Sequence, residues 1–285
     1  MSDTVSVVAE VERELARQRC RRADGDPPEL RTSTLTHVAW VPPRWLDRAH
    51  ATLDGLEERH PARTILLVPE PRRRDGVEAK VEVREFDLPG LGTEVMSEVV
   101  EVRLRGAAAA HPSSIVLPLL VSDLPVFCRW RGDLDVSSPA FKDLVRVVDR
   151  LVVDSAEWRD PAGSYPRLTR LFERVVVSDL AYRRGLAWRL RLSEHWPGIR
   201  SLSRIRVVGP KADALLLAGW LRSRLRRAVE LTHRSASVLD AVTLDGVPVA
   251  PPQGGTPTGS DALSAELEVL GRDPVYEAAA RRADA

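Results

Sequence analysis

The chain has 285 residues, with 42 lysines and arginines against 41 aspartates and glutamates, and a formal net charge of +1. That length allows two modest domains or one large one, and the balanced charge argues against partners such as nucleic acid or an anionic membrane. The longest apolar runs are far shorter than the ~20 residues that span a bilayer. The first residues lack the basic start and apolar middle of a signal peptide. With only Cys20 and Cys128, a disulfide framework is not expected. The composition favours a soluble, cytoplasmic protein.

The first half of the chain alternates helical and strand patterns. Val8, Val11 and Leu15 recur at helical spacing and predict an amphipathic helix at the start of the chain. Further helices are predicted at 44–60 and 138–148. Strands are predicted at 34–41, 63–69, 77–86, 97–106, 125–130 and 150–155. Strands that alternate with helices in this way indicate an α/β architecture.

The pattern restarts after about residue 165. Helices are predicted at 165–175, 181–196, 211–227 and 275–283. Strands are predicted at 203–210, 228–233, 237–246 and 262–270. We therefore expect an α/β fold with mixed sheets flanked by helices, in two α/β domains. The first, 1–164, carries the DLPVFCRWRG motif, and the second is 165–285.

Segment 117–132, LPLLVSDLPVFCRWRG, joins an apolar run to a polar and aromatic end. That end consists of Arg129, Trp130, Arg131 and Gly132. The apolar run is typical of a buried core strand, with Leu119 and Val126 in the core. We interpret the segment as a core strand whose end curls outward at Gly132, so that the arginines and the tryptophan are both reachable.

Motifs for cofactors and metals are weak in this chain. GLGTEV, at 90–95, begins like a dinucleotide-binding loop but lacks the third glycine, so a turn between two strands is the better interpretation. The six histidines show no pair at i and i+4 with an acidic partner, which leaves a metal site unsupported. We expect no cofactor and no metal.

Catalytic patterns are equally weak. Asp154-Ser155 and the pair Ser122-Asp123 lack the glycines of a nucleophile elbow. Glu157 follows three residues after Asp154, which indicates the start of a helix rather than a catalytic site. Four arginines end the helix predicted at 211–227, where cations complement the helix dipole. They are Arg222, Arg224, Arg226 and Arg227. A phosphate-binding patch there is the alternative to a solvated helix end.

Seven tryptophans stand among few other aromatic residues, and several of them lie beside arginine, as in Arg129-Trp130-Arg131 and Trp158-Arg159. Both residue types are enriched at the energetic centres of protein interfaces. The alternative is that these tryptophans lie in the core, with arginine stems along them. The pattern favours at least one such site facing a partner.

Several stretches of the chain together resemble one known family. They are RTSTLTHVAWV, HPARTILLVP, SSIVLPLLVSDLPVFCRWRGDL, LVRVVDRLVVDSAEW, LFERVVVSDLAYRRGLAWRLRLSEHWPGI and GPKADALLLAGWLRSRLRRAVEL. In this order, over roughly residues 30 to 250, they resemble the glucose-6-phosphate dehydrogenase assembly protein family, OpcA.

The resemblance implies a non-catalytic assembly factor or allosteric activator of glucose-6-phosphate dehydrogenase, in the oxidative pentose phosphate pathway. Glucose-6-phosphate dehydrogenase would be the partner, with neither nucleic acid nor membrane involved. The candidate contact residues are Arg129, Trp130, Arg131, Asp123 and Trp158. A sugar-phosphate-binding α/β enzyme stays open as the alternative, because ligands of α/β folds bind at the carboxyl ends of parallel strands.

Overall fold

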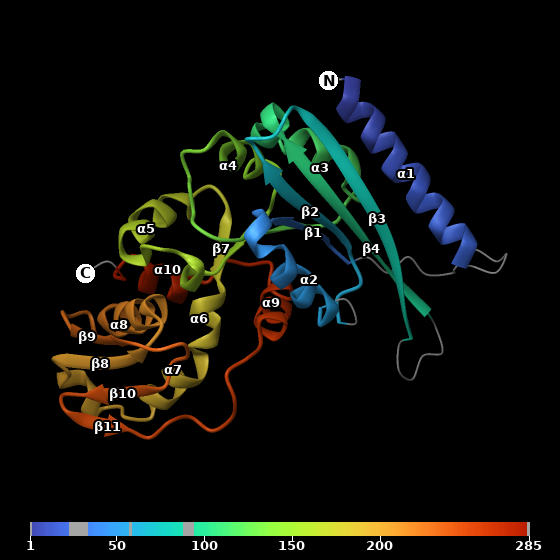
Figure 1. Cartoon of the computed structure of the whole chain (residues 1–285). Coiled ribbons are helices and arrows are strands. Elements are labelled where there is room, and N and C mark those ends of the chain that lie inside the picture. Colours follow the sequence, from blue (N-terminus) through green and yellow to red (C-terminus); the bar gives the residue numbers. More distant parts are fainter. Residues whose placement is uncertain (1, 23–33, 57–58, 88–93, 284–285) are drawn as a thin grey trace. The chain divides into compact units, whose positions relative to one another are not determined.

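The structure is a computed structural model and describes residues 2–22, 34–56, 59–87 and 94–283. It divides the chain into two compact units, Met1–Leu151 and Val152–Ala285 (Figure 1). The sequence predicts a boundary at 164/165. In the structure, residues 152–164 instead lie in the second unit. Two sheets and flanking helices confirm the predicted α/β class. None of the described helices is both long and apolar enough to cross a membrane.

The first unit is built on a sheet in which five strands run in the order β3-β4-β2-β1-β5. These strands are β1 (Thr36–Trp40), β2 (Arg63–Glu70), β3 (Gly76–Asp87), β4 (Glu94–Arg105) and β5 (Val126–Trp130). β1 lies parallel to both β2 and β5, β2 lies parallel to β4, and β3 pairs antiparallel with β4. Every residue of β1 and β5 is buried, as expected of parallel strands that are covered on both faces.

Helices of the first unit follow the apolar pattern of the sequence. They are α1 (Ser2–Arg22), α2 (Leu46–Asp54), α3 (Ser113–Leu119) and α4 (Pro139–Leu144), with 3-10 turns at Pro43–Trp45 and Gly106–Ala110. α1 packs against β3 and buries Val11 and Leu15, which confirms the predicted amphipathic helix. The Ser138 hydroxyl caps α4 by accepting a hydrogen bond from the Phe141 N–H.

The prediction of one core strand across 117–132 is wrong in its first part. Its apolar start belongs to helix α3, and the strand β5 begins only at Val126. Ile115, Val116 and Leu119 form the buried face of α3, whereas Leu117 is exposed. That burial has helical spacing, which an all-apolar run of seven residues does not reveal by its composition. Leu119 and Val126 both lie in the core, as predicted.

The second unit carries a four-stranded sheet in the order β11-β10-β8-β9. Its strands are β8 (Arg204–Gly209), β9 (Glu230–Ser235), β10 (Ala241–Leu244) and β11 (Val247–Val249). β8 is parallel to β9 and antiparallel to β10. The core on one side of the sheet contains Ile205 and Val207 of β8, together with Leu217 and Leu221 of helix α8 (Lys211–Leu225).

The remaining helices of the second unit are α5 (Pro161–Leu168), α6 (Leu180–Arg184), α7 (Leu186–Ser193), α9 (Gly259–Leu267) and α10 (Pro274–Ala280). Strand β7 is Val176–Asp179, β6 (Arg150–Val153) spans the division between the units, and 3-10 turns lie at Ser155–Glu157, Thr169–Leu171 and Gly198–Ser201. The predicted strand at 262–270 is wrong, because most of it lies in α9. A capping box of Thr258 and Asp261 starts that helix by satisfying its first backbone N–H groups.

Candidate functional site

The Arg129-Trp130-Arg131 triplet lies at the end of β5 and inside the protein. Trp130 faces Trp40 across the β1–β5 pair, and the two rings stack with centroids 4.8 Å apart and planes within 8°. The edge of Phe141 contacts the same ring, 5.1 Å between centroids. The Trp130 indole N–H donates to the Asp133 carbonyl oxygen at 3.2 Å. Trp130 is 4% exposed, so its ring is part of the core.

Both arginines of the triplet are buried as well. Arg129 is 2% exposed, and its guanidinium donates to the carbonyl oxygen of Trp130 at 2.5 Å. Arg131 reaches α2 and donates to the Thr52 hydroxyl at 2.7 Å. The chain does turn at Gly132, where φ is +78° and an added Cβ would lie 3.0 Å from the Trp45 indole nitrogen. The expectation that the triplet itself curls outward is wrong, because its side chains are held before that turn.

The other two candidate contact residues differ in exposure. Asp123 is exposed and occupies a left-handed turn, φ +64°, between α3 and β5. Trp158 is buried and lies edge-on to Tyr165, with ring centroids 5.5 Å apart. Of the five candidates, only Asp123 therefore reaches solvent. Partner contact through these five residues stays a prediction.

His37 on β1 and Cys128 on β5 are two titratable groups close to the triplet. Burial, with the charges of Arg129 and Arg131, lowers the pKa of His37 to about 3. Burial raises the pKa of Cys128 to about 12. At neutral pH the imidazole is uncharged and the thiol is protonated, so the structure gives neither group the activation expected of a base or a nucleophile.

The second unit holds a buried cluster of three carboxylates, Asp154, Asp179 and Asp213, with Arg184. Arg184 pairs with both oxygens of Asp154 at 2.8 Å. Burial raises the pKa of Asp213 to about 7, although Arg184 opposes the shift. Burial, and then the charge of Asp154, raises the pKa of Asp179 to about 6. One arginine does not balance three buried carboxylates, which favours protonation of the other two.

This cluster also explains Asp154 and Ser155, which on paper could enter a hydrolase triad. The Asp154 carboxylate accepts from the Ala156 N–H and so caps the 3-10 turn that follows, which confirms the interpretation as a helix start. The Ser155 hydroxyl is fully buried and accepts from the Tyr165 hydroxyl at 2.9 Å. Both side chains therefore have structural partners, and neither is open to a substrate.

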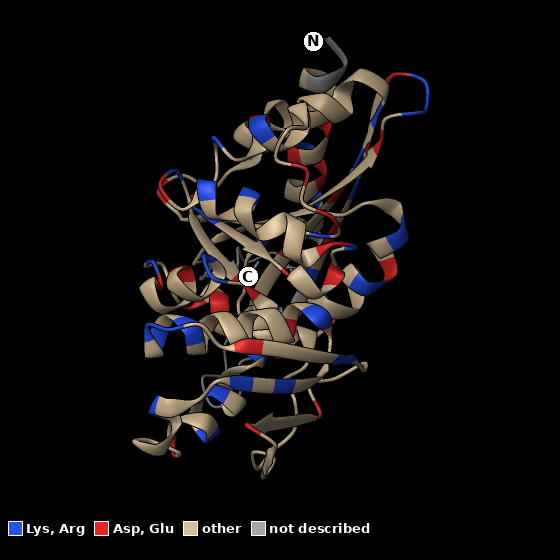
Figure 2. Cartoon of the chain, turned by 90° about the vertical axis from the view of Figure 1, so that its left-hand side faces the viewer, with Lys and Arg blue, Asp and Glu red and all other residues tan. Residues whose placement is uncertain are grey.

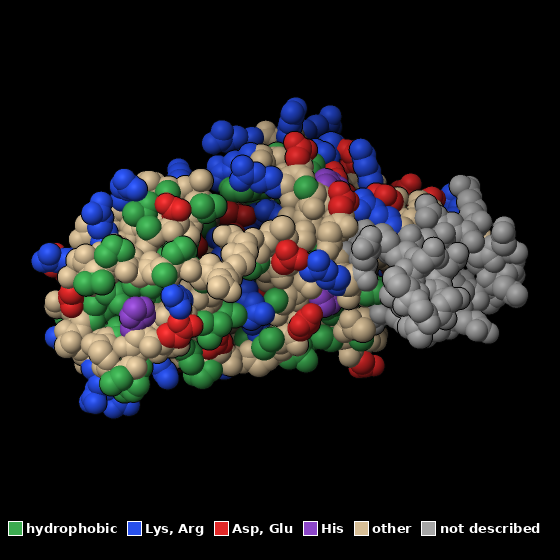
Figure 3. All heavy atoms as spheres, turned by 90° about the horizontal axis from the view of Figure 1, so that it is seen from below, with side chains coloured by type: hydrophobic (Ala, Val, Ile, Leu, Met, Phe, Trp, Pro, Cys, Tyr) green, Lys and Arg blue, Asp and Glu red, His purple; other side chains and the backbone are tan. Residues whose placement is uncertain are grey.

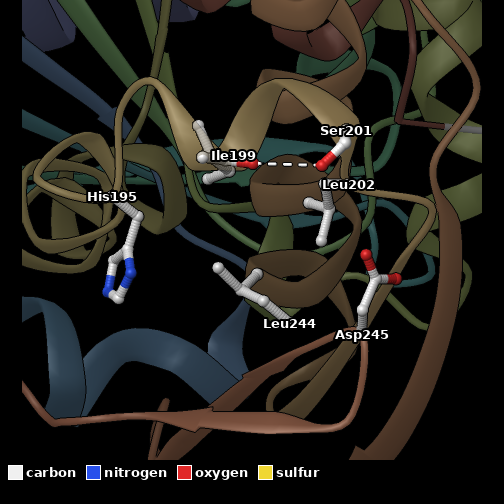
Figure 4. Close-up of a pocket in the computed structure, with 7 residues that line it drawn as sticks. His195, Ile199, Ser201, Leu202, Leu244 and Asp245 are labelled. Carbon is white, nitrogen blue, oxygen red and sulfur yellow. Dashed lines mark hydrogen bonds between the residues drawn. The ribbon is translucent and has the colours of Figure 1, made fainter.

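A small pocket of about 210 Å³ opens at the end of the second unit's sheet (Figure 4). It is lined by His195, Gly198, Ile199, Ser201, Leu202, Leu244 and Asp245. The Asp245 carboxylate accepts from the Ser203 hydroxyl at 2.7 Å and from the Arg204 N–H at 2.7 Å, contacts that lower its pKa. In Figure 4 the His195 ring lies across the pocket from Asp245, with Leu244 between them.

That pocket is suited to hold an apolar group rather than to transform a substrate. Its only carboxylate is already committed to backbone and hydroxyl donors of the turn, and Ile199, Leu202 and Leu244 supply apolar walls. Among the described residues, no cluster of three or more His, Cys, Asp or Glu side chains could hold a metal ion. The sequence interpretation missed this pocket, which forms where 195–202 meets the turn after β10.

The fold and these sites define a two-unit α/β protein in which the candidate reactive groups described above are buried or engaged in structural hydrogen bonds. Residues 54–170 match the family model described as glucose-6-phosphate dehydrogenase subunit N-terminal domain. This match and the two relatives below confirm the resemblance that the sequence carries: the chain is similar to the OpcA family.

Two curated relatives carry the name OxPP cycle protein OpcA. The relative from Nostoc punctiforme is 29% identical over 183 residues, which cover 60% of this chain and 39% of the relative. The relative from a Synechocystis species is 22% identical over 184 residues, which cover 61% of this chain and 39% of the relative. The matched part of the chain thus spans about two fifths of the length of these relatives. No solved structure matches the chain.

Proposed function

We propose that this chain is a non-catalytic, cytoplasmic partner of glucose-6-phosphate dehydrogenase, which assists the assembly of the enzyme or shifts it toward its active state. The observation that carries the proposal is the family match over 54–170, whose description names a subunit of that dehydrogenase. Ser155, Asp154 and Asp245 take part in hydrogen bonds that stabilise the fold. This supports a binding role rather than a catalytic one for the chain.

An activator works by binding the active form of its enzyme more tightly than the inactive form. A coupling free energy of roughly 1–3 kcal/mol changes an apparent affinity about 5- to 150-fold. The chain can provide such coupling through contacts that exist only in the active assembly, and it needs no reactive group for that purpose.

Steady-state kinetics with the dehydrogenase from the same cell test the proposal. We expect no turnover of glucose 6-phosphate by this chain alone with either nicotinamide cofactor. Added in saturating excess, the chain should raise the velocity of the dehydrogenase or lower its apparent KM. Superimposable kinetics with and without the chain would refute activation, and turnover by the chain alone would support the sugar-phosphate enzyme instead.

Assembly is measured separately from activation. Light scattering of the dehydrogenase across a dilution series reports its oligomeric mass. We expect the chain to preserve the larger oligomer at concentrations where the enzyme alone dissociates, because a ligand of the assembled state stabilises it by mass action. An unchanged dissociation curve together with altered kinetics would leave activation as the function and exclude assistance of assembly.

A further inference from the structure

Positive charge is concentrated in one segment of this nearly neutral chain. Residues 198–236 contain nine lysines and arginines, whereas the acidic residues in the segment are only Asp213 and Glu230. The basic residues are Arg200, Arg204, Arg206, Lys211, Arg222, Arg224, Arg226, Arg227 and Arg234. Asp213 and Arg222 are both buried, so neither contributes to the surface charge. The segment therefore presents a local positive field that the balanced total conceals.

The open face of the second unit's sheet displays part of this charge. β8 begins with alternating exposed and buried residues, which turns Arg204 and Arg206 toward solvent while Ile205 and Val207 enter the core. The strand register places Arg206 between Thr232 of β9 and Thr243 of β10. Figure 2 shows the Lys and Arg bands on the strands of this sheet.

The cations on this face differ in how far they are neutralised. Arg204 is paired with Glu230 at 3.0 Å. Arg206 has no carboxylate partner within the part of the chain that the structure describes, and Arg234 is exposed on β9. An unpaired, exposed guanidinium is available for a carboxylate on another molecule.

The end of α8 and the turn at Gly198–Ser201, which precedes the start of β8 at Arg204, carry further cations. Arg227 donates to the carbonyl oxygen of Arg200 at 3.1 Å, which holds the helix end against that turn. The Arg200 guanidinium lies over the ring of Trp196, 5.4 Å from the ring centroid, which is within the ~6 Å reach of a cation–π contact. Trp196 is 60% exposed, unlike the buried Trp130.

An apolar anchor and a pocket thus border the exposed cations. Figure 3 shows Lys and Arg side chains around hydrophobic ones on the surface of the second unit. Exposed Trp and Arg side chains together are typical of the energetic centre of a protein interface. The neighbouring pocket is walled by Ile199, Leu202 and Leu244 and has the Asp245 carboxylate at its edge. The apolar walls of this pocket fit an apolar protein side chain better than a phosphate group.

We infer that the surface formed by Trp196, Arg200, Arg206, Arg227 and Arg234, which we term the basic face, docks an acidic surface of a partner protein. The inference rests on the proposed function and assigns that acidic surface to the dehydrogenase. Charge complementarity carries it: the basic face offers guanidinium groups to carboxylates, Trp196 offers apolar area, and the pocket receives one apolar side chain of the partner.

Charge reversal in the full-length chain tests the inference. In the double variant Arg206→Glu and Arg234→Glu, the affinity for the dehydrogenase measured by calorimetry should fall at least 10-fold. The matched control is Arg72→Glu with Arg74→Glu, which makes the same change in net charge on an exposed turn of the first unit. The control should bind within about 2-fold of wild type, because it leaves every residue of the basic face unchanged.

Two further measurements complete the test. Trp196→Ala should weaken binding at least 10-fold, while its thermal unfolding matches wild type. Raising the salt concentration should weaken wild-type binding more than binding of the charge-reversed variant. A wild-type chain that binds the dehydrogenase, with Arg206→Glu/Arg234→Glu and Trp196→Ala binding equally well, would overturn the basic face while leaving the proposed function standing.

The other outcomes are also decisive. If the wild-type chain fails to bind the dehydrogenase at all, the proposed function and this inference both fail. A 20-base-pair DNA duplex serves as the probe for a polyanion partner. If wild type binds the duplex in a manner that depends on Arg206, while its affinity for the dehydrogenase does not depend on Arg206, the basic face is a nucleic-acid site and docking of a protein is overturned.

Discussion

β5 in the first unit, VFCRW, and β8 in the second, RIRVVG, both carry arginines among apolar residues. All of β5 is buried, including Arg129, whereas β8 starts with an alternation that exposes Arg204 and Arg206. β5 lies beside the parallel strand β1, in a sheet of the kind that is covered on both faces. β8 lies between the parallel strand β9 and the antiparallel strand β10, and its exposed arginines mark an open face of this sheet.

The contrast between the two strands shows whether an arginine next to a tryptophan in the sequence indicates a protein interface. The Arg-Trp-Arg triplet at the end of β5 stabilises the fold. Its arginines donate hydrogen bonds to a carbonyl and a hydroxyl oxygen, and its tryptophan stacks on Trp40. The exposed pair in the second unit is Trp196 with Arg200, which are not adjacent in the sequence. Adjacency of the two residue types therefore does not indicate an interface, whereas period-two alternation along a strand does indicate an exposed face.

The largest expected effect concerns the thiol of Cys128, which tests the burial of β5. Cys20 is exposed and Cys128 is buried. With its pKa raised to about 12, Cys128 has a thiolate fraction of about one part in 10,000 at pH 8. A chromogenic thiol reagent should titrate one thiol per native chain rapidly and the second only after denaturant is added. Two thiols that react rapidly in the native protein would show that β5 is accessible.

Truncation of Trp130 should give the largest loss of stability among the tryptophan variants. Trp130→Ala removes the stack on Trp40 and the contact with Phe141, and we expect the free energy of unfolding to fall by about 3–5 kcal/mol. Chemical denaturation provides the measurement, and Trp196→Ala is the matched control, expected within about 0.5 kcal/mol of wild type. If the two variants have equal unfolding midpoints, Trp130 is not a core residue that differs from the exposed Trp196.

Much of the fold could be predicted from the sequence, because period and run length are local signals. The alternation of Arg204, Ile205, Arg206 and Val207 marks β8, and the apolar run 63–69 marks β2. The structure differs at α3 and α9, where short apolar runs fit a strand as well as a helix. In α9 the capping box of Thr258 and Asp261 is the signal that favours the helix.

The candidate site was less predictable, because exposure depends on what covers a strand. The sequence places Trp130 beside Arg129 and Arg131, but the buried partner Trp40 lies on a strand far away in the chain. The basic face had a sequence signal in the excess of cations over 198–236. The pocket had none, since it depends on where the turn at Asp245 meets residues 195–202.

The carboxylate cluster predicts a stability that falls as the pH rises. Asp213 titrates near 3.8 in an unfolded chain and near 7 in the folded protein. Between these values the folded protein binds more protons, so the free energy of unfolding should decrease from about pH 4 to pH 7 and then level off. Asp213→Asn removes the buried charge and should raise stability at pH 8 by roughly 2–4 kcal/mol, with a smaller gain at pH 5.

The control for that experiment is Asp245→Asn, because the hydrogen bonds from Ser203 and Arg204 lower the pKa of Asp245. A lowered pKa contributes stability that is present above the unfolded value and is lost as the pH falls, so this variant should be less stable than wild type at pH 8. The two variants therefore shift in opposite directions. Urea unfolding at pH 5 and pH 8 measures both, and a destabilised Asp213→Asn would refute the assignment of an uncompensated charge.

The smallest expected effect is that of Arg206→Ala, and it returns to the contrast between the two strands. Arg206 is exposed on β8 and has no carboxylate partner among the described residues, so its removal should change the free energy of unfolding by about 0.5 kcal/mol or less. The same substitution at Arg129 removes a buried hydrogen bond to Trp130 and the packing of the arginine stem, and should cost roughly 1–3 kcal/mol. Denaturation midpoints of the two variants are compared directly. If Arg206→Ala proves as destabilising as Arg129→Ala, Arg206 serves the fold of the second unit rather than a partner, and the open face of the sheet is not free for docking.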